Sequence, residues 1–470
     1  MKVEQIYTGC LSQASYLIVS KGEAVVIDPL RDVDKYIKLA TKNNSKIKYV
    51  IETHFHADFI SGHLTLANLT GAKIIYGPNA DPEFKAIIAK DNQIFNFGNV
   101  SLKTIHTPGH TLESTSFLLK DERGKEHSIF TGDTLFLGDV GIPDVAQRYK
   151  GVSKEELAGI LYDSVNERIK PLPGDILVYP GHGAGSACGK NMMKETVDTL
   201  KNQKQINYAI NGSFTKEKFV KELTDNLPEP PSYFPYNVKL NQQGYEDLHD
   251  IITKSKKPLS VNDFESMVDE DDIIILDVRS QDEFASAHVP NSVFIGLDGG
   301  FAPWVGSILS DIDKPILLVS NEDRVEEAII RLSRVGFDNV KGYLKGGILS
   351  WQNAGKSINK VNNIKSNDFY SFIEKSFNSK NKTLIIDVRN DNEFNKYRFK
   401  NVLHCNLNNL EYVINTQQKE QDILVYCAGG YRSMMAASIL KKNNFKNINN
   451  LQNGIDYIFY NYQDVPFLEG

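Results

Sequence analysis

The second half of this chain carries the same set of short motifs twice. The motifs DVR, EF and GI stand at 277–279, 283–284 and 347–348, and they return at 387–389, 393–394 and 454–455. Each copy begins with a helical pattern, continues into a strand that ends in DVR, and closes with a strand that leads into a helix. Alternating strands and helices predict a parallel sheet with helices on both faces. We therefore expect two related three-layer α/β domains, at residues 255–358 and 363–470.

The first half has no such repeat, and we expect it to form one larger domain over residues 1–245. Strands are expected at 14–19, 24–28, 47–52, 100–106, 115–120, 127–131 and 175–179, and helices at 33–44, 153–169, 190–203 and 215–226. Lys21-Gly22 is a hairpin signal, and Ser153 with Glu156 forms a capping-box pattern. Residues 227–244 carry four prolines without periodicity, which favours a linker or an arm packed on a domain surface.

Composition and charge exclude several classes of protein. Apolar residues are 41% and charged residues 24% of the 470, which is typical of a globular chain rather than a disordered or fibrous one. The net charge of −6, without a basic block, argues against a nucleic acid or an anionic membrane as partner. No apolar run reaches about 18 residues, so we expect no membrane span.

The four cysteines of the chain are far apart and form no CxxC pair. They are Cys10, Cys188, Cys405 and Cys427. This spacing predicts neither a disulfide framework nor a zinc ribbon. Free thiols fit a reducing compartment, and we expect a cytoplasmic protein.

Histidines and aspartates follow four of the expected strands of the first half. They lie in the segments THFHAD (53–58), TPGH (107–110), TGD (131–133) and PGH (180–182). Imidazoles and carboxylates that converge from separate loops are what a transition metal needs. By spacing alone the candidate ligands are His54, His56, Asp58, His110, Asp133 and His182. The alternative, histidines that merely pack or hydrogen-bond, does not account for this order of segments.

These segments resemble the metallo-β-lactamase superfamily, and the resemblance covers residues 1 to about 245. It implies an αββα fold with a metal centre. The family's pattern is HxHxDH, then His, Asp and His, and this sequence departs from it at Phe59, where the family's second metal places a histidine. Phenylalanine cannot bind a metal. A mononuclear site is therefore the better interpretation.

Two histidines and one carboxylate with open positions are the arrangement of non-heme Fe(II) oxygenases. Within this fold the chain resembles the persulfide dioxygenases, and the segment PEPPSYFPYN is similar to their C-terminal arm. The resemblance implies one Fe(II) per chain, held by His54, His110 and Asp133. It makes His56, Asp58 and His182 groups that orient the ligands and bound water. Spacing alone would also allow His56 as a ligand, and that question stays open here.

The resemblance also bears on the substrate. The glutathione-persulfide enzymes carry an arginine after the metal-binding aspartate, and Ile142 stands at that place. Another low-molecular-weight persulfide, on coenzyme A or a bacterial thiol, is as plausible as glutathione persulfide. Cys188 is expected either to be a small buried residue or to be a thiol near the iron that relays sulfur.

A second candidate site begins at Cys427. The cysteine follows an expected strand at 423–426 and opens a loop, Ala428, Gly429, Gly430 and Tyr431, that leads through Arg432 into a helix. Backbone N–H groups, the helix dipole and Arg432 together stabilise a thiolate or the anion of a persulfide. The alternative is an inert buried cysteine.

This loop and the DVRxxxEF motif resemble the rhodaneses, and the resemblance covers about residues 365 to 470. Four residues separate Cys427 from Arg432, whereas a thiolate phosphatase needs five to hold a phosphate. The resemblance implies sulfur transfer through a persulfide on Cys427, with Arg432 assisting. The sister domain at 255–358 has Ser320 in place of the cysteine, in a shorter loop with Glu322 and Asp323, and we interpret it as a rhodanese fold without catalysis that serves as spacer or docking surface.

Together these parts resemble the bacterial fused persulfide dioxygenase–sulfurtransferases of sulfide detoxification. The resemblance implies that a persulfide and O2 give sulfite and thiol at the iron, and that Cys427 passes sulfur to sulfite to form thiosulfate. It also implies a homo-oligomer. Two other functions remain open: a thioester hydrolase of the glyoxalase II type, and a persulfide carrier or sensor with an idle metal site.

Overall fold

The computed structural model describes residues 1–143, 151–225, 227, 230–268, 272–369, 371–373, 383–462 and 468–469. The chain forms two compact units. The first comprises residues 1–251, 310–312 and 332–337, and the second comprises residues 252–309, 313–331 and 338–470. The expected boundaries 1–245, 255–358 and 363–470 remain a prediction.

The first unit is built on two sheets that pack face to face. One has the order β1-β2-β3-β4-β5-β6, with Lys2–Thr8, Gln13–Ser20, Glu23–Ile27, Lys46–Ile51, Lys73–Tyr76 and Ile87–Ile88. The other has the order β12-β11-β10-β9-β8-β7, with Asp198–Thr199, Leu177–Pro180, Glu126–Gly132, Thr115–Lys120, Val100–His106 and Ile94–Phe97. Side chains from both sheets, among them Tyr16, Ile18, Phe117 and Phe130, form the core between them.

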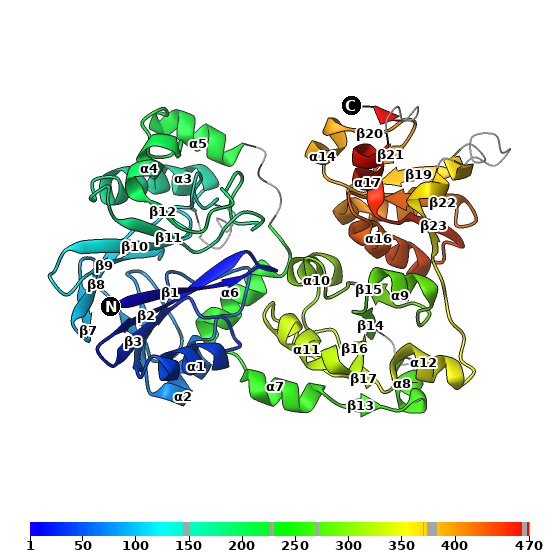
Figure 1. Cartoon of the computed structure of the whole chain (residues 1–470), viewed down its shortest axis with the longest axis horizontal. Coiled ribbons are helices and arrows are strands. Elements are labelled where there is room, and N and C mark those ends of the chain that lie inside the picture. Colours follow the sequence, from blue (N-terminus) through cyan, green and yellow to red (C-terminus); the bar gives the residue numbers. More distant parts are fainter. Residues whose placement is uncertain are drawn as a thin grey trace. The chain divides into compact units, whose positions relative to one another are not determined.

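Helices cover the outer faces of these two sheets (Figure 1). The helices of this part are α1 (Asp34–Lys42), α2 (His63–Thr70), α3 (Lys154–Asp163), α4 (Leu200–Ile206), α5 (Lys216–Thr224), α6 (Phe234–Gln243) and α7 (Leu248–Ser255), which runs into the second unit. Helices α1 and α2 pack on the first sheet, and α3, α4 and α5 pack on the second. The expected αββα arrangement is confirmed.

The second unit contains two parallel sheets, as the repeat predicted. One has the order β13-β17-β16-β14-β15, with Pro258–Leu259, Val340–Leu344, Ile316–Val319, Ile274–Asp277 and Val293–Phe294. The other has the order β18-β23-β22-β19-β21, with Asn362–Ile364, Asn447–Leu451, Asp422–Tyr426, Leu384–Asp387 and Leu403–His404. Neighbouring strands pair in parallel in both sheets. The short strands β20 (Arg398–Phe399) and β24 (Leu468–Glu469) form a separate antiparallel pair.

Helices alternate with these strands. Around the first parallel sheet, called the middle module below, they are α8 (Val261–Val268), α9 (Gln281–Ser286), α10 (Phe301–Leu309), α11 (Val325–Ser333) and α12 (Gly347–Asn353). Around the second sheet, the C-terminal module, they are α14 (Asp391–Lys396), α15 (Glu411–Thr416), α16 (Tyr431–Lys442) and α17 (Gly454–Asn461). The expected fold class, two rhodanese-like α/β modules with parallel sheets, is confirmed.

The repeated DVR motif is a buried ion pair at the end of a central strand. In the C-terminal module the Arg389 guanidinium donates to Asp387 at 3.0 and 2.8 Å and to the Tyr397 carbonyl at 2.6 Å. Arg279 makes the matching bonds to Asp277 and to the Ala287 carbonyl in the middle module. The motif therefore ties a strand end to the turn after the next helix, which explains its recurrence.

One expectation about the first unit is wrong in part. A helix was expected at 190–203, but helix begins only at Leu200, because the Asp139 carboxylate accepts the N–H groups of Lys190 and Asn191 at 2.7 and 2.5 Å. Of the two alternatives for residues 227–244, the arm packed on a domain surface agrees with the structure: the segment contains α6, whose Asn241 donates to the His56 and Phe59 carbonyls. The first turn of α6 accommodates a proline because its N–H would be unpaired there. The capping box at Ser153 is confirmed, and α3 continues into a π-helix at Ser164–Ile169.

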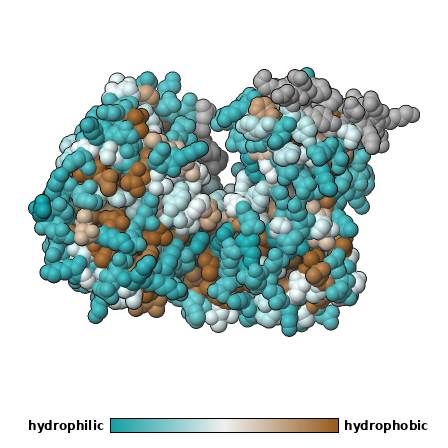
Figure 2. Space-filling view, in the orientation of Figure 1, coloured by the Kyte–Doolittle hydropathy of each residue, from teal (hydrophilic) through white to brown (hydrophobic). Residues whose placement is uncertain are grey.

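Hydrophilic residues cover most of the face shown in Figure 2, with hydrophobic residues scattered among them. Among the described residues, none of the helices has the length and apolar character needed to cross a lipid bilayer.

Removing one partner of the DVR pair should destabilise its module. Arg389→Met leaves the buried Asp387 carboxylate without its cation, and we expect a loss of about 3 kcal/mol in the free energy of unfolding. Urea denaturation of the intact chain measures this. The exposed Lys400→Met is the matched control and should change the midpoint little; equal midpoints for the two variants would contradict the prediction.

Candidate functional sites

The structure brings His54, His110 and Asp133 together at the ends of three different strands. His54 follows β4, His110 lies in the loop after β8, and Asp133 directly follows β10. The Nε2 atoms of His54 and His110 lie 4.0 and 3.7 Å from Asp133 Oδ2, and all three side chains are almost fully buried. One ligand atom from each lies within 4.8 Å of the others. This is the predicted convergence of the strand-end loops.

Hydrogen bonds fix which ring nitrogen of each histidine is free. The Thr53 hydroxyl donates its one hydrogen to Asp28 Oδ2 at 2.9 Å, so Thr53 Oγ1 accepts from His54 Nδ1–H at 2.9 Å. The Ile142 carbonyl accepts from His110 Nδ1–H at 2.7 Å. Both rings therefore use Nδ1 for these hydrogen bonds and turn Nε2 toward Asp133. Two imidazole lone pairs and a carboxylate, oriented by such outer partners, fit a divalent transition metal.

His182 connects Asp133 to Asp58. Its Nδ1 lies 2.8 Å from Asp133 Oδ1, and its Nε2 lies 2.9 Å from Asp58 Oδ2. Burial disfavours the imidazolium, but the two carboxylates outweigh burial and raise the pKa of His182 well above its usual range. Burial would likewise raise the pKa of Asp133, but the surrounding histidines, His182 foremost, hold it well below its usual range. His182 thus orients the carboxylate of the candidate centre.

The His56 ring lies beside that of His54, with centroids 4.2 Å apart, but its Nε2 faces Asp28 and Glu52 rather than Asp133. Its Nε2 lies 3.2 Å from Asp28 Oδ1 and 3.3 Å from Glu52 Oε2, and its ring stacks on Phe59 with centroids 4.3 Å apart. Burial disfavours the charged ring, but Asp28 and Glu52 raise the pKa of His56 to about 10. Spacing alone could not show this, because Asp28 comes from another strand.

Cys188 is buried beside the same centre. Its Sγ, an oxygen of Asp58 and a ring nitrogen of His182 lie within 4.8 Å of one another. The Cys188 carbonyl accepts the Ile142 N–H at 2.9 Å, and Ile142 in turn holds His110. The expected helix at 190 does not follow Cys188, so this thiol has no helix N-terminus behind it.

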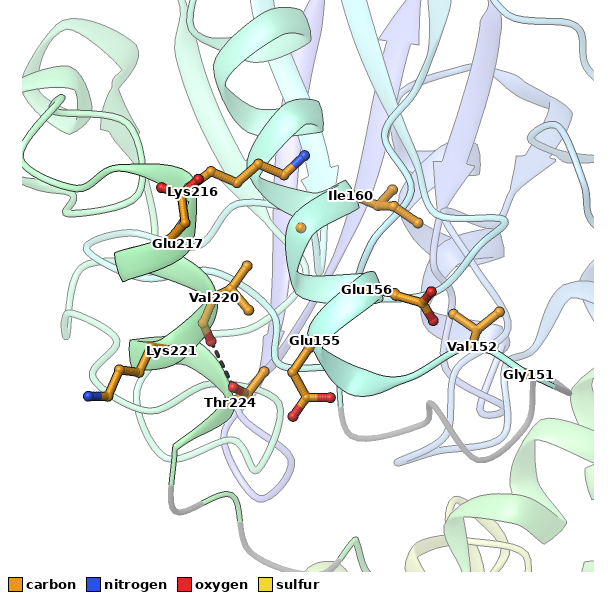
Figure 3. Close-up of a pocket in the computed structure, with 11 residues that line it drawn as sticks. Gly151, Val152, Glu155, Glu156, Ile160, Lys216, Glu217, Val220, Lys221 and Thr224 are labelled. Atoms are coloured by element: carbon orange, nitrogen blue, oxygen red, sulfur yellow. Dashed lines mark hydrogen bonds between the residues drawn. The ribbon is translucent and has the colours of Figure 1, made fainter.

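An open groove of the first unit lies elsewhere, between α3 and α5. Figure 3 shows residues that line it on α3, among them Glu156 and Ile160, and on α5, among them Val220 and Thr224. Its lining among the described residues includes no histidine or cysteine. The groove does not include the candidate metal ligands.

Cys427 stands where the sequence predicted, between β22 and α16. Its Sγ accepts the Gly430 N–H at 3.1 Å and lies 3.5 Å from Ser433 Oγ, whose hydroxyl can donate to this sulfur or to the Gly430 carbonyl at 3.0 Å. Gly430 adopts φ = +90°, which turns its N–H toward the sulfur and which a side chain would strain. The thiol therefore faces donors at the first turn of a helix, the arrangement that stabilises a sulfur anion.

Arg432 and Ala428 are held by groups of the C-terminal module itself. Arg432 makes two hydrogen bonds of 2.6 Å to the Glu393 carboxylate, so the repeated EF motif supplies its partner. The Ala428 carbonyl accepts the Asp456 N–H, and a Cβ at Gly454 would lie 2.0 Å from that carbonyl oxygen. The glycine of the GI motif therefore lets the backbone at residue 454 lie directly against the backbone of the cysteine loop. A Cβ at Gly429 would meet open space.

The matching loop of the middle module differs in kind. Ser320 is buried where Cys427 stands in the sister, and its hydroxyl donates to the Asn321 carbonyl at 3.0 Å. The Glu322 carboxylate accepts the Gly346 N–H at 2.9 Å. A loop that already holds its own carboxylate is a poor site for a second anion.

Comparison with known proteins identifies both halves. Residues 8–182 match the model of the metallo-beta-lactamase superfamily, and residues 260–354 and 373–458 each match the rhodanese-like domain. The chain belongs to the metallo-beta-lactamase superfamily and carries rhodanese-like domains in its second half.

Its relatives differ in activity. The human mitochondrial persulfide dioxygenase ETHE1 is 33% identical over 216 residues, 44% of this chain and 74% of that protein. A hydroxyacylglutathione hydrolase of Francisella tularensis subsp. novicida is 34% identical over 174 residues, 37% of this chain and 63% of that protein. The chain thus spans less than two thirds of the length of that hydrolase.

A crystal structure of a metallo-beta-lactamase from Staphylococcus aureus is similar to this chain. The TM-score is 0.63 at 32% sequence identity, over 73% of this chain and 98% of that one.

The candidate centre can be tested by its affinity for metal. We expect His110→Ala to weaken binding of a divalent transition metal by at least about 100-fold, because it removes an oriented Nε2. His106→Ala is the matched control: its ring bonds to the Leu112 carbonyl, and it is not one of the three clustered groups. Metal content after dialysis against a chelator of stated affinity measures the difference. Equal retention by the two variants would remove His110 from the centre.

Proposed function

We propose that this protein oxidises a low-molecular-weight persulfide with O2 at one non-heme Fe(II) and then forms thiosulfate on its C-terminal module. In the first reaction, R–S–S⁻, O2 and H2O give R–SH, sulfite and a proton. In the second, a further persulfide passes its outer sulfur to sulfite, which gives thiosulfate and the thiolate. The observation that carries the proposal is the pairing of a two-histidine, one-aspartate cluster with a cysteine loop of rhodanese type in one chain.

The residues of the first site would hold iron through His54 Nε2, His110 Nε2 and Asp133. Iron held by these three groups would supply the means to activate O2 for reaction with the persulfide. Thr53 and Ile142 keep the two rings in the required tautomer, and His182 fixes the carboxylate. The similarity to a persulfide dioxygenase supports iron over zinc.

The second site would act through Cys427. Its thiolate attacks the outer sulfur of a persulfide, the S–S bond of the donor breaks, and the donor leaves as a thiol after taking a proton. The persulfide on Cys427 sits against the Gly430 N–H and the Ser433 hydroxyl until sulfite attacks its outer sulfur. That attack forms the thiosulfate S–S bond and returns the Cys427 thiolate.

The side chain at position 142 bears on which persulfide is used. The Ile142 side chain is buried and uncharged, and the Ile142 carbonyl accepts the His110 Nδ1–H. Ile142 therefore offers no charged group to a glutathione carboxylate. Asp144, the end of the same sequence segment, lies outside the described residues. We therefore propose a panel of persulfides, on glutathione, coenzyme A and cysteine, as the first substrates to compare.

A hydrolase remains the second candidate, because hydroxyacylglutathione hydrolases match the same part of the chain. Phe59 fills the place of a second-metal ligand and stacks on His56. Two metals per chain and cleavage of S-lactoylglutathione without oxygen uptake would favour the hydrolase. Oxygen uptake with any persulfide, at one iron per chain, favours the dioxygenase.

Exchange of the loop cysteine should separate the two reactions. We expect Cys427→Ser to lower thiosulfate formation to the uncatalysed rate while oxygen uptake and sulfite formation continue, because the two reactions use different residues. Cys405→Ser, a second buried cysteine of the same module, is the control. Thiosulfate and sulfite are quantified separately during oxygen uptake. A Cys427→Ser variant that still forms thiosulfate at the wild-type rate would contradict the proposed sulfur transfer through Cys427.

Cys188 offers a test of sulfur relay near the first site. If its thiol accepts sulfur there, Cys188→Ser should raise the ratio of sulfite to thiosulfate, since a thiol next to Asp58 and His182 lies at the candidate centre. Cys10→Ser serves as control. A sulfite-to-thiosulfate ratio identical to that of the wild type would show that the Cys188 thiol only packs, while the Cys188 carbonyl accepts the Ile142 N–H.

A further inference from the structure

The side chain of Tyr431 leaves the C-terminal module and contacts the middle module. Its hydroxyl donates to the Gly296 carbonyl at 2.7 Å. Its ring lies directly over Gly299, where a Cβ would fall 2.3 Å from the ring carbon Cζ. Phe294 packs edge-on against the same ring, with centroids 5.8 Å apart. The middle module thus encloses this side chain from several sides.

Tyr431 is also the first residue of α16, next to the groups that contact the candidate nucleophile. The preceding residue, Gly430, gives its N–H to Cys427 Sγ, and the Oγ of Ser433 on the same turn lies 3.5 Å from that sulfur. A shift of Tyr431 would therefore move both donors relative to the sulfur. Gln281, at the start of α9, borders the loop as well: its Oε1 lies 3.5 Å from the place that a Cβ at Gly430 would take.

The segment that holds Tyr431 is itself fixed. Arg331 donates to the Leu297 carbonyl at 2.6 Å, and Arg324 pairs with Asp298 at 2.8 Å. The Phe294 N–H donates to Ser438, a buried residue further along α16, at 3.0 Å. Figure 1 shows α16 beside β15 and α9 of the middle module, and residues of these elements are in contact. The contact therefore anchors the helix at two points.

We propose that the middle module positions the sulfur-transfer loop: its residues 294–299 hold Tyr431 and so fix the first turn of α16 against Cys427. The module without a cysteine then has a role in the reaction of its sister. Tyr431 is a positioning residue, because only its backbone belongs to the loop around the sulfur and its side chain acts through the helix. The inference rests on Cys427 being the sulfur carrier.

Two substitutions in the intact chain test this. Tyr431→Phe removes the hydroxyl and keeps the ring, while Gly299→Ala places a methyl group where the ring lies. Tyr412→Phe is the matched control, since this exposed tyrosine of the same module lies on α15. The rate of alkylation of Cys427 by iodoacetamide is followed across pH by mass spectrometry of its peptide, together with kcat and KM for thiosulfate formation from glutathione persulfide and sulfite.

We expect Tyr431→Phe to slow alkylation of Cys427 at neutral pH by about fivefold, the usual effect of losing one hydrogen bond, and Gly299→Ala to slow it more. The midpoint of the pH profile should move upward, and kcat should fall more than KM changes. A merely structural contact would lower the melting temperature without moving that profile. Profiles of both variants that superimpose on the wild type, or an equal shift in Tyr412→Phe, would overturn the inference.

The same experiment separates this inference from the proposed function. If wild-type protein forms no thiosulfate but the alkylation profile still moves in both variants, the sulfurtransfer proposal fails and the positioning stands. If wild-type protein forms thiosulfate and neither variant differs from it, the positioning fails and the sulfurtransfer proposal stands.

Discussion

The orientation of the histidines in the first site depends on the buried carboxylate of Asp28. It ends the hairpin of β2 and β3, and it accepts both the N–H and the hydroxyl of Thr53 at 2.8 and 2.9 Å. Through Thr53 it sets the tautomer of His54, and its other contact is His56. A carboxylate from one strand therefore decides which of two neighbouring histidines faces the candidate centre. Without it the HxH motif alone leaves both arrangements open.

Backbone carbonyl groups orient the other candidate ligand histidine, His110. The Ile142 carbonyl holds His110, and the Cys188 carbonyl holds Ile142. Such contacts do not depend on the identity of the side chain at 142. The side chain at position 142 can therefore change while His110, a candidate metal ligand, keeps its orientation.

Local patterns in the sequence were sufficient for several strands of the first unit and for the residues at their ends, but β5, β6 and β7 were not expected. β8 and β9 lie at the expected residues, and His54, His110 and Asp133 meet because each follows a strand. The helix expected at 190–203 failed because its early N–H groups bond to Asp139, a residue distant in sequence. The sequence also did not predict the contacts of His56 with Asp28 or the hydrogen bond of Tyr431 to Gly296. Each depends on a residue that only the fold brings near.

The Glu322 carboxylate, which accepts the Gly346 N–H, bears on the proposed sulfur transfer. Two sister loops of equal affinity would divide bound sulfur between them, and half of it would wait at a place with no nucleophile. A loop that carries its own permanent anion does not compete. Under the proposed function the two sister loops therefore do not divide sulfane sulfur between them: it binds at Cys427, and the middle module contributes its contact with Tyr431 instead.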